Sequence, residues 1–395
     1  MDTDMILKVA LFTPGLNGGW GLPLLFWGPP GIGKSHVIEK QAAINGLHCE
    51  TLVASIREPA DFGGMPHFEE VGKTTFVKYA PAAWAADFDT EYQGRGVTFI
   101  DEITTCPGAV QAALLRLVLN RALGEYKVAP GVRFLAAANP ADQAAGGWDL
   151  AQPLANRFGH LDFPIPDANP WISWLLTGEA VAEDAEDAEA IDAAALEKRV
   201  MKAWPAAYAK ASGMVAAFIK ARPELLYKKP ENHDPKASKA WPSPRTWAMA
   251  THAVAGCMIH GASEIVMDEL VSAFVSAKVA AEFTTFRNKL DLPDPEHVLD
   301  GKVEFEHNPR RLDRTMAVLS SCSALVTSVK TRQKDRATKL WTILSDIQEH
   351  AADLCVAPAA ALVQNQLFGG AEARAALVAI APVLEAANIN LRKGK

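Results

Sequence analysis

The sequence lacks any apolar run of about 18 residues, roughly the length that a helix needs to cross a bilayer. Residues 1–12 also lack the basic segment that opens a secretory signal peptide. We therefore expect a soluble, cytoplasmic protein with no membrane partner.

Cysteine is scarce, and its pattern argues against metal-binding and disulfide-rich proteins. The chain has five cysteines, an odd number, and no two of them have the spacing of a metal-binding pair. The ten histidines form no H-E-x-x-H motif or cluster, and no G-x-S-x-G motif for a serine nucleophile is present. We expect free, mostly buried thiols in a reducing compartment, at Cys49, Cys106, Cys257, Cys322 and Cys355.

An excess of positive charge is also absent. Lys and Arg total 39 against 46 Asp and Glu, which leaves a net charge of −7. This balance disfavours non-specific binding to nucleic acid or to anionic lipid. With 395 residues, 49% of them hydrophobic, the chain has enough material for two or three globular domains.

The order of the expected elements indicates an α/β fold in the first part of the chain. Apolar segments typical of buried strands occur at residues 24–27, 51–55, 97–100 and 132–137, with helical patterns between them. Before the last of these strands, five apolar residues recur at helical spacing and would form one helix face: Val110, Ala113, Leu114, Leu117 and Val118. We expect a parallel sheet flanked by helices over residues 1–165.

Beyond a proline-rich joint the chain reads as almost entirely helical. An acidic, alanine-rich stretch at residues 179–192 is typical of a solvated helix face or a surface loop. A polar loop at 228–244 and a break at 290–301 interrupt the helical pattern. These features predict three parts: the α/β core at 1–165, a helical part at 166–290 and a helical C-terminal domain at 291–395.

Residues 28–35, GPPGIGKS, fit the phosphate-binding pattern G-x-x-x-x-G-K-[S/T] between an expected strand and an expected helix. Glycines allow positive φ angles and let backbone N–H groups approach phosphate oxygens, while the following helix adds partial positive charge. Lys34 would reach the β- and γ-phosphates, and Ser35 would bind Mg²⁺. We expect ATP and Mg²⁺ to bind at Gly28, Pro29, Pro30, Gly31, Ile32, Gly33, Lys34, Ser35, His36 and Asp101.

The strand expected at 97–100 runs into two carboxylates, Asp101 and Glu102. Beside a phosphate loop, the first would hold Mg²⁺ through water next to Ser35. The second would polarise a water for in-line attack on the γ-phosphate. A carboxylate that activates water favours an ATP hydrolase over a small-molecule kinase.

Two more polar residues are candidates for the same site. Asn139 follows the strand at 132–138, where it would lie between the first two strand ends and orient the attacking water; otherwise it forms a turn before Pro140. Arg157 stands before a short apolar stretch. An arginine close to a γ-phosphate stabilises transition-state charge and can come from a neighbouring subunit, whereas the alternative is an ordinary surface arginine.

With these motifs in place, the chain resembles the AAA+ ATPases, and within them the MoxR-type branch. The matching segments follow the family's order between residues 24 and 258: GPPGIGKS, REPADFGGMP, VTFIDEITTCPGAVQAALLRLVLN, VRFLAAANPAD, LANRF and SPRTW. The resemblance implies that Lys34 and Ser35 belong to Walker A and that Asp101 and Glu102 form Walker B. It also implies that Asn139 is sensor 1.

The same resemblance assigns two arginines and two hairpins. Arg157 looks like an arginine finger that acts on the next subunit. Arg245 would be sensor 2, which reaches from a helical lid over residues 166–290 back to the γ-phosphate. The branch also has one hairpin that would lie at 67–80, turning at Gly72-Lys73, and a second at 122–134, with Pro130-Gly131 as its turn signal.

The function that the resemblance implies is mechanical. Subunits would form a ring, a hexamer, bind ATP at their interfaces and use its hydrolysis to remodel or activate a client protein, typically with a partner bearing a von Willebrand factor A domain. A nucleic-acid motor is the alternative, against which the acidic charge and the lack of a recognisable DNA-binding module both count. A nucleotide switch without hydrolysis is disfavoured by the joint presence of Glu102, Asn139 and Arg157.

Overall fold

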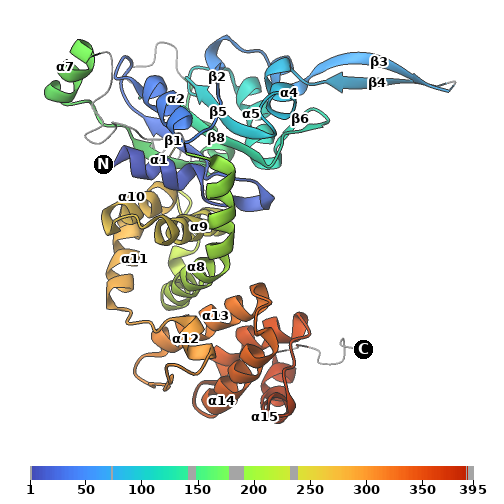
Figure 1. The fold of residues 1–395 in the computed structure, drawn as a ribbon, viewed down its shortest axis with the longest axis vertical. Helices are drawn as coiled ribbons and strands as arrows, with labels where there is room; N and C mark the ends of the chain where they lie inside the picture. Colours follow the sequence, from blue (N-terminus) through green and yellow to red (C-terminus); the bar gives the residue numbers. More distant parts are fainter. Residues whose placement is uncertain are drawn as a thin grey trace. The chain divides into compact units, whose positions relative to one another are not determined.

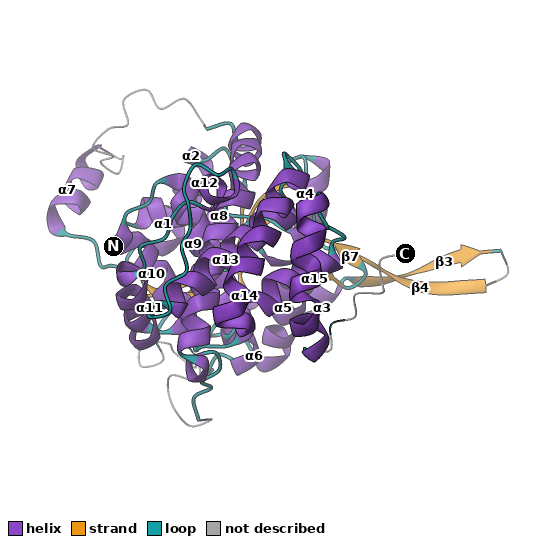
Figure 2. Cartoon of the chain, turned by 90° about the horizontal axis from the view of Figure 1, so that it is seen from below, coloured by secondary structure: helices purple, strands orange, loops and turns teal. Residues whose placement is uncertain are grey.

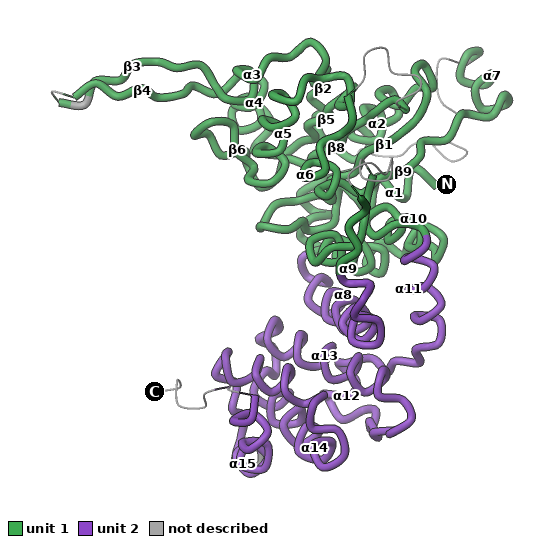
Figure 3. Tube along the Cα trace, turned by 180° about the vertical axis from the view of Figure 1, so that it is seen from behind, with its two compact units in different colours: residues 1–200, 227–277 green, residues 201–226, 278–395 purple. Residues whose placement is uncertain are grey.

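The chain divides into two compact units. One comprises Met1–Val200 and Tyr227–Ala277, and the other Met201–Leu226 and Lys278–Lys395 (Figure 3). The structure, a computed structural model, describes residues 2–72, 74–140, 148–177, 191–231, 239–387 and 389. The sequence predicts three parts, a core, a lid and a C-terminal domain, and this division into three differs from the two compact units and stays a prediction.

Five parallel strands form the central sheet of the first unit, in the order β2-β5-β8-β1-β9 (Figure 1). They are β1 (Leu24–Trp27), β2 (Cys49–Val53), β5 (Arg95–Asp101), β8 (Gly131–Ala138) and β9 (Gly159–Asp162). The predicted sheet and its four strand candidates are confirmed, with β2 beginning two residues earlier than expected. Since β1 and β8 are buried on both faces, they read as continuous apolar runs.

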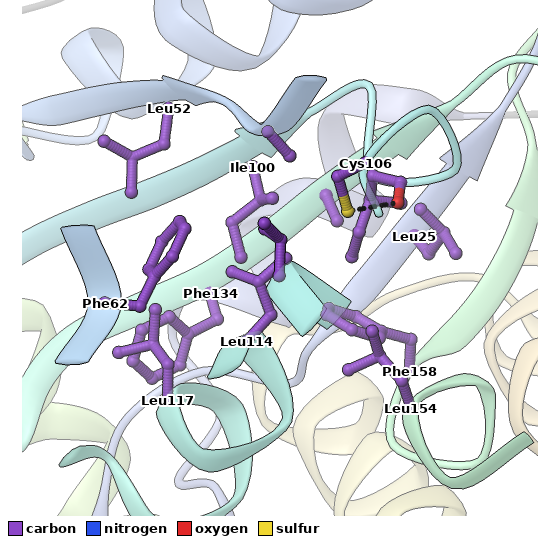
Figure 4. Close-up of a cluster of buried hydrophobic side chains, with 14 of the residues drawn as sticks. Leu25, Leu52, Phe62, Ile100, Cys106, Leu114, Leu117, Phe134, Leu154 and Phe158 are labelled. Carbon is purple, nitrogen blue, oxygen red and sulfur yellow. Dashed lines mark hydrogen bonds between the residues drawn. The ribbon is translucent and has the colours of Figure 1, made fainter. Parts of the chain in front are cut away.

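Helices and short turns surround this sheet and contribute buried side chains to its core. Those before residue 158 are α1 (Thr3–Leu11), η1 (Leu16–Gly18), α2 (Lys34–Ile44), η2 (Ala54–Ile56), α3 (Pro59–Gly63), α4 (Ala83–Thr90), α5 (Gly108–Asn120) and α6 (Gln152–Ala155). The predicted apolar face of α5 is confirmed: Val110, Leu114 and Leu117 are buried in the cluster drawn in part in Figure 4, while Ala113 and Val118 pack against it.

Two hairpins leave the sheet region. The first, β3 (Met65–Val71) with β4 (Thr74–Ala80), is confirmed where the sequence predicts it, and it projects from the other elements of its unit (Figures 1 and 2). Its turn residue Lys73 lies outside the described residues. The second, β6 (Ala122–Leu123) with β7 (Tyr126–Lys127), turns at Gly124-Glu125. The prediction of a turn at Pro130-Gly131 is therefore wrong, because Gly124 supplies the positive φ of 56° while Gly131 begins β8.

The remaining helices of the first unit are α7 (Ala168–Thr177), the start of α8 (Ala193–Ala221), α9 (Pro244–His260) and α10 (Glu264–Val275). The carboxylate of Glu197 near the start of α8 accepts hydrogen bonds from Arg133 on β8, at 2.6 Å, and from Arg95 on β5, at 3.2 Å. This buried pairing fixes the first turns of α8 to the sheet. Of the acidic stretch at 179–192, residues 179–190 lie outside the described part, as do residues 232–238 of the polar loop.

The second unit is helical in its described residues. It contains the rest of α8, η3 (Pro223–Leu225), α11 (Ala277–Lys289), α12 (Pro295–Leu299), α13 (Leu312–Ser328), α14 (Gln333–Gln364) and α15 (Ala371–Ala386). Its core includes Trp341 and the α14 stripe Leu340, Leu344 and Ile347. The predicted helical C-terminal region is therefore confirmed.

Two expected absences can be compared with the structure. All five cysteines are described and none forms a disulfide; Cys49 is half-buried and the other four are buried. Across the described ranges, no helix is both long enough and apolar enough to span a bilayer.

Candidate functional site

The loop at residues 28–35 connects the carboxyl end of β1 to α2. Gly31 and Gly33 have φ values of +80° and +88°, a region that side chains disfavour, and a Cβ added to either would meet no atom within 4 Å. In the described structure the amides of Gly31, Ile32 and Gly33 donate to no backbone carbonyl. Together with the N-terminus of α2, these donors and this open space fit a phosphate group.

Lys34 lies under this loop with only 7% of its surface exposed. Its ammonium donates to the carbonyls of Gly28 at 2.7 Å and Pro29 at 2.8 Å, and to Oδ1 of Asn139 at 3.0 Å. Burial lowers the pKa of Lys34, while the nearby carboxylates of Asp101 and Glu102 oppose that shift. The ammonium is thus held at the base of the loop, where a bound phosphate would pair with it.

Ser35 and Asp101 supply neighbouring oxygens at the end of the loop. The Ser35 hydroxyl donates to Oδ2 of Asp101 at 2.7 Å, and the other Asp101 oxygen accepts the amide of Glu102 at 2.8 Å. A hydroxyl and a carboxylate are hard oxygen ligands, the kind that Mg²⁺ takes alongside water and phosphate oxygens. The residues present therefore fit a magnesium ion, which Ser35 and Asp101 would hold beside the loop.

Glu102 has a left-handed backbone conformation, with φ of 55°, which is uncommon for a residue with a side chain. Its carboxylate accepts a hydrogen bond from the Ser55 hydroxyl at 2.5 Å. Strained conformations of this kind concentrate at functional sites. No sequence motif marks Ser55; it reaches Glu102 because β2, which precedes it, neighbours β5 in the sheet.

Asn139 follows β8, and β8 lies between β1 and β5 in the sheet, as expected. Its amide oxygen contacts the ammonium of Lys34, as described above. The structure therefore brings five of the predicted residues together at the carboxyl edge of the sheet: Lys34, Ser35, Asp101, Glu102 and Asn139. His36, on the first turn of α2, faces Trp174 of α7, with their rings 6.1 Å apart.

Arg157 and Arg245 lie elsewhere, at the opposite edge of the same sheet. Both line a cavity of about 290 Å³ whose wall includes Leu22 and Pro23, the residues just before β1, and a third arginine, Arg121. The Arg157 guanidinium donates to the carbonyl of Pro153, and burial, followed by the charge of Arg245, lowers the pKa of Arg157. The structure does not bring Arg245 to the phosphate loop of its own chain, because α9 begins at the edge of the sheet where the amino ends of the strands lie.

Asn156 joins these two arginine segments, although no sequence motif marks it as a site residue. Its side-chain oxygen accepts from the Ser243 hydroxyl at 3.0 Å and from Arg245 at 3.5 Å, while its amide donates to the carbonyl of Trp241 at 3.2 Å. The residue is buried. It therefore ties the segment before β9 to the N-terminal end of α9.

Replacing Asn156 by Ala should lower the free energy of unfolding by about 1–3 kcal/mol, because it leaves the Trp241 carbonyl and the Ser243 hydroxyl with fewer partners in a buried site. Urea unfolding followed by circular dichroism measures the change. Asn120→Ala, at the exposed end of α5, is the matched control and should stay within about 0.5 kcal/mol of wild type. An equal loss in both variants would contradict the bridging role of Asn156.

Comparison with known proteins finds a family match in the part of the chain that carries the phosphate loop and its carboxylates. Residues 23–158 match the family described as AAA domain (dynein-related subfamily), a range that contains every predicted site residue except Arg245. No curated protein matches the chain. Among solved structures, the chain is similar to a crystal structure from Cytophaga hutchinsonii described as a "putative ATPase", with 14% identity, a TM-score of 0.43 and coverage of 73% of this chain and 88% of that one.

Proposed function

We propose that this chain, which carries an AAA domain and is an ATP-hydrolysing enzyme of that type, works in a ring of identical subunits and uses ATP to remodel a partner protein. The observation that carries the ring is the separation of the two halves of the candidate site. The loop and its carboxylates occupy one edge of the sheet, while Arg157 and Arg245 occupy the other. A head-to-tail contact between copies would join them, and such contacts close into rings.

Each residue at the carboxyl edge has a distinct role in this proposal. Bound ATP would supply the γ-phosphoryl group, and Mg²⁺ would neutralise developing charge. Lys34 and the loop amides would hold the phosphates, and Ser35 with Asp101 would hold the cation. Glu102 would take a proton from the water that attacks the γ-phosphorus, with ADP as the leaving group, once its carboxylate exchanges the hydroxyl of Ser55 for that water. Asn139, fixed against Lys34, orients the same water.

The arginines of the neighbouring copy would complete this site. A guanidinium carries a permanent charge and several donors in one plane, which suits phosphate oxygens. Arg157 has a buried Nε without a hydrogen-bond partner among the described residues. Arg245 lines the same cavity, so we assign it to the neighbour's nucleotide as well, in place of a role at its own loop.

Helix α7 supports an assembled state. It presents exposed apolar side chains, among them Trp171 at 49%, Leu175 at 58% and Leu176 at 80% of their full exposure. Apolar surface of this kind on a separate copy commonly marks an interaction site. The contact between Trp174 and His36 places it beside the phosphate loop, where the proposed neighbour would lie.

The finer assignment, a MoxR-type chaperone with a von Willebrand factor A domain partner, rests on the motif resemblance. The projecting β3–β4 hairpin is consistent with a protein client, because Phe68, Phe76 and Val77 are exposed on it. Capture of such a partner by ATP-bound protein would support this assignment. Salt-dependent stimulation of ATP hydrolysis by DNA would instead favour a nucleic-acid motor.

Assembly can be tested by sedimentation velocity. With Mg²⁺ and saturating ATP, the Glu102→Gln variant should sediment as a species of about six subunits, because bound nucleotide would join the two edges and would not be hydrolysed. Lys34→Ala, which loses the ammonium under the loop, should stay smaller under the same conditions. A purely monomeric Glu102→Gln protein with ATP bound would contradict the ring.

A further inference from the structure

Two hydrogen bonds link Trp27, the residue before the phosphate loop, through His160 to Ala155 of α6, within one subunit. The indole N–H of Trp27 donates to Nδ1 of His160 at 2.9 Å, and Nε2 of His160 lies 2.9 Å from the carbonyl oxygen of Ala155. The Trp27 and His160 rings also stack, with centroids 5.9 Å apart. This path crosses from β1 to β9 and continues to α6.

The two hydrogen-bond partners of His160 determine which ring nitrogen carries the hydrogen. Since Nδ1 accepts from an indole, which can only donate, the ring hydrogen sits on Nε2 and is donated to Ala155. Desolvation by burial lowers the pKa of His160 to about 4, so the ring is neutral near pH 7. The charged groups nearest this path are Asp162 and Lys239, which pair with each other at 3.3 Å. The bridge is therefore a neutral imidazole with one fixed tautomer.

On the loop side, Trp27 directly precedes Gly28, whose carbonyl accepts the ammonium of Lys34 at 2.7 Å. The backbone on either side of this point is bonded to neighbouring strands. The amide of Gly28 donates to Ala138 at 3.1 Å, and the carbonyl of Trp27 accepts from Phe163 at 2.6 Å. A displacement of the loop backbone at Gly28 would therefore also displace the Trp27 indole, because these hydrogen bonds hold the intervening backbone in place.

On the arginine side, the path ends on a short helix. Ala155 is the last residue of α6, and its carbonyl is the acceptor for His160. Pro153, two residues before Ala155 in the same helix, accepts a hydrogen bond from the Arg157 guanidinium through its carbonyl. The same single turn of helix thus bonds to the imidazole and to the arginine.

We propose that His160 is a positioning residue, which links the phosphate loop of its own subunit to Arg157 and so sets how Arg157 is presented to the nucleotide of the next subunit. This rests on the proposed trans role of Arg157. In the described part of the chain, the hydrogen bonds of the His160 ring go to Trp27 and Ala155. Its effect on turnover would pass entirely through Trp27 and α6.

His160→Phe tests the link, since it keeps a ring and removes both hydrogen bonds. We expect turnover to fall about 10- to 100-fold, the cost of displacing a catalytic group by a fraction of an ångström to an ångström, while ATP affinity changes less than about twofold. His160→Gln, which keeps one donor and one acceptor, should recover part of the loss. His260→Phe is the matched control and should turn over normally, because His260 is a half-buried histidine that bonds the carbonyl of Phe12 away from this path.

A mixing experiment separates positioning of Arg157 from damage to the loop. His160→Phe retains a working loop, and Glu102→Gln retains a working Arg157, so a mixture of the two should recover turnover that neither variant shows alone. Adding Arg157→Ala to His160→Phe should cause no loss beyond that of Arg157→Ala itself.

Two results would overturn the link. If His160→Phe fails to recover with Glu102→Gln while Arg157→Ala does recover with it, His160 acts on its own loop and the positioning role is wrong. If neither mixture recovers, the trans role of Arg157 falls, and the positioning role falls with it. Trp27→Phe, which keeps the aromatic ring and loses the indole N–H, should behave as His160→Phe does if the fold is intact by circular dichroism.

Discussion

Glu102→Gln should bind ATP as wild type does and hydrolyse it about 10²–10⁴-fold more slowly. An amide of nearly the same shape can still accept the Ser55 hydrogen bond, so the local structure should persist. It cannot accept a proton from water, which is the step that the carboxylate supplies. The variant therefore separates nucleotide binding from chemistry.

Phosphate release under saturating Mg²⁺ and ATP measures this loss, and a fluorescent ATP analogue measures binding. Glu91→Gln is the matched control, because it makes the same chemical change at an exposed position after α4 and should leave turnover unchanged. Undiminished turnover in Glu102→Gln would remove this residue from the mechanism. Lost binding would mean that the carboxylate serves the fold of the site instead.

Arg157→Ala should reduce turnover by about 10³-fold or more, the range of effects that an arginine has when it meets the charge of a transferring phosphoryl group. Binding of ATP to the isolated subunit should remain, since Arg157 lies at the edge of the sheet opposite the loop. The loss should be in turnover with little change in nucleotide affinity. Arg374→Ala, an exposed arginine on α15, is the control for loss of charge alone.

A strong dependence of wild-type turnover on protein concentration should accompany this result. Dilution below the point where copies associate would remove Arg157 from the neighbour's site and reduce turnover per subunit. Full activity in a dilute monomer, or an Arg157→Ala variant as active as wild type, would contradict the assignment. Either result would return Arg157 to the role of an ordinary surface arginine.

Much of the α/β core could be predicted because its signals are local. The continuous apolar runs of β1 and β8 and the helical spacing of Val110, Leu114 and Leu117 each report burial directly. β9 is not predicted, since GHLD offers one apolar residue and becomes a strand only by pairing with β1. The turn of the second hairpin is at Gly124 for a similar reason. Pairing between the two-residue strands β6 and β7, and not a local sequence signal, places the turn at Gly124 instead of Gly131.

The candidate site shows the same division. Each of the residues brought together at the phosphate loop lies at or after the carboxyl end of β1, β5 or β8, and parallel strands bring their carboxyl ends to one edge of the sheet. These residues are Lys34, Ser35, Asp101, Glu102 and Asn139. Asn156 and His160 carry no such signal, because Trp241, a partner of Asn156, and Trp27, a partner of His160, are 85 and 133 residues away in the chain. Arg245 could be found by its motif, but no sequence pattern indicates the edge of the sheet at which α9 begins. The position of α9 therefore decides whether one subunit can form a complete site or whether two subunits are needed.

Mixing two inactive variants tests this separation most directly. Arg157→Ala keeps its loop and Glu102, whereas Glu102→Gln keeps Arg157, so only an interface between them holds a complete site. In a ring assembled at random from equal amounts, about a quarter of the interfaces would pair the loop of the first with the arginine of the second. If Arg157 acts on the neighbouring subunit, the mixture regains a comparable fraction of wild-type turnover; a mixture as inactive as its components, in rings shown to contain both, would contradict it.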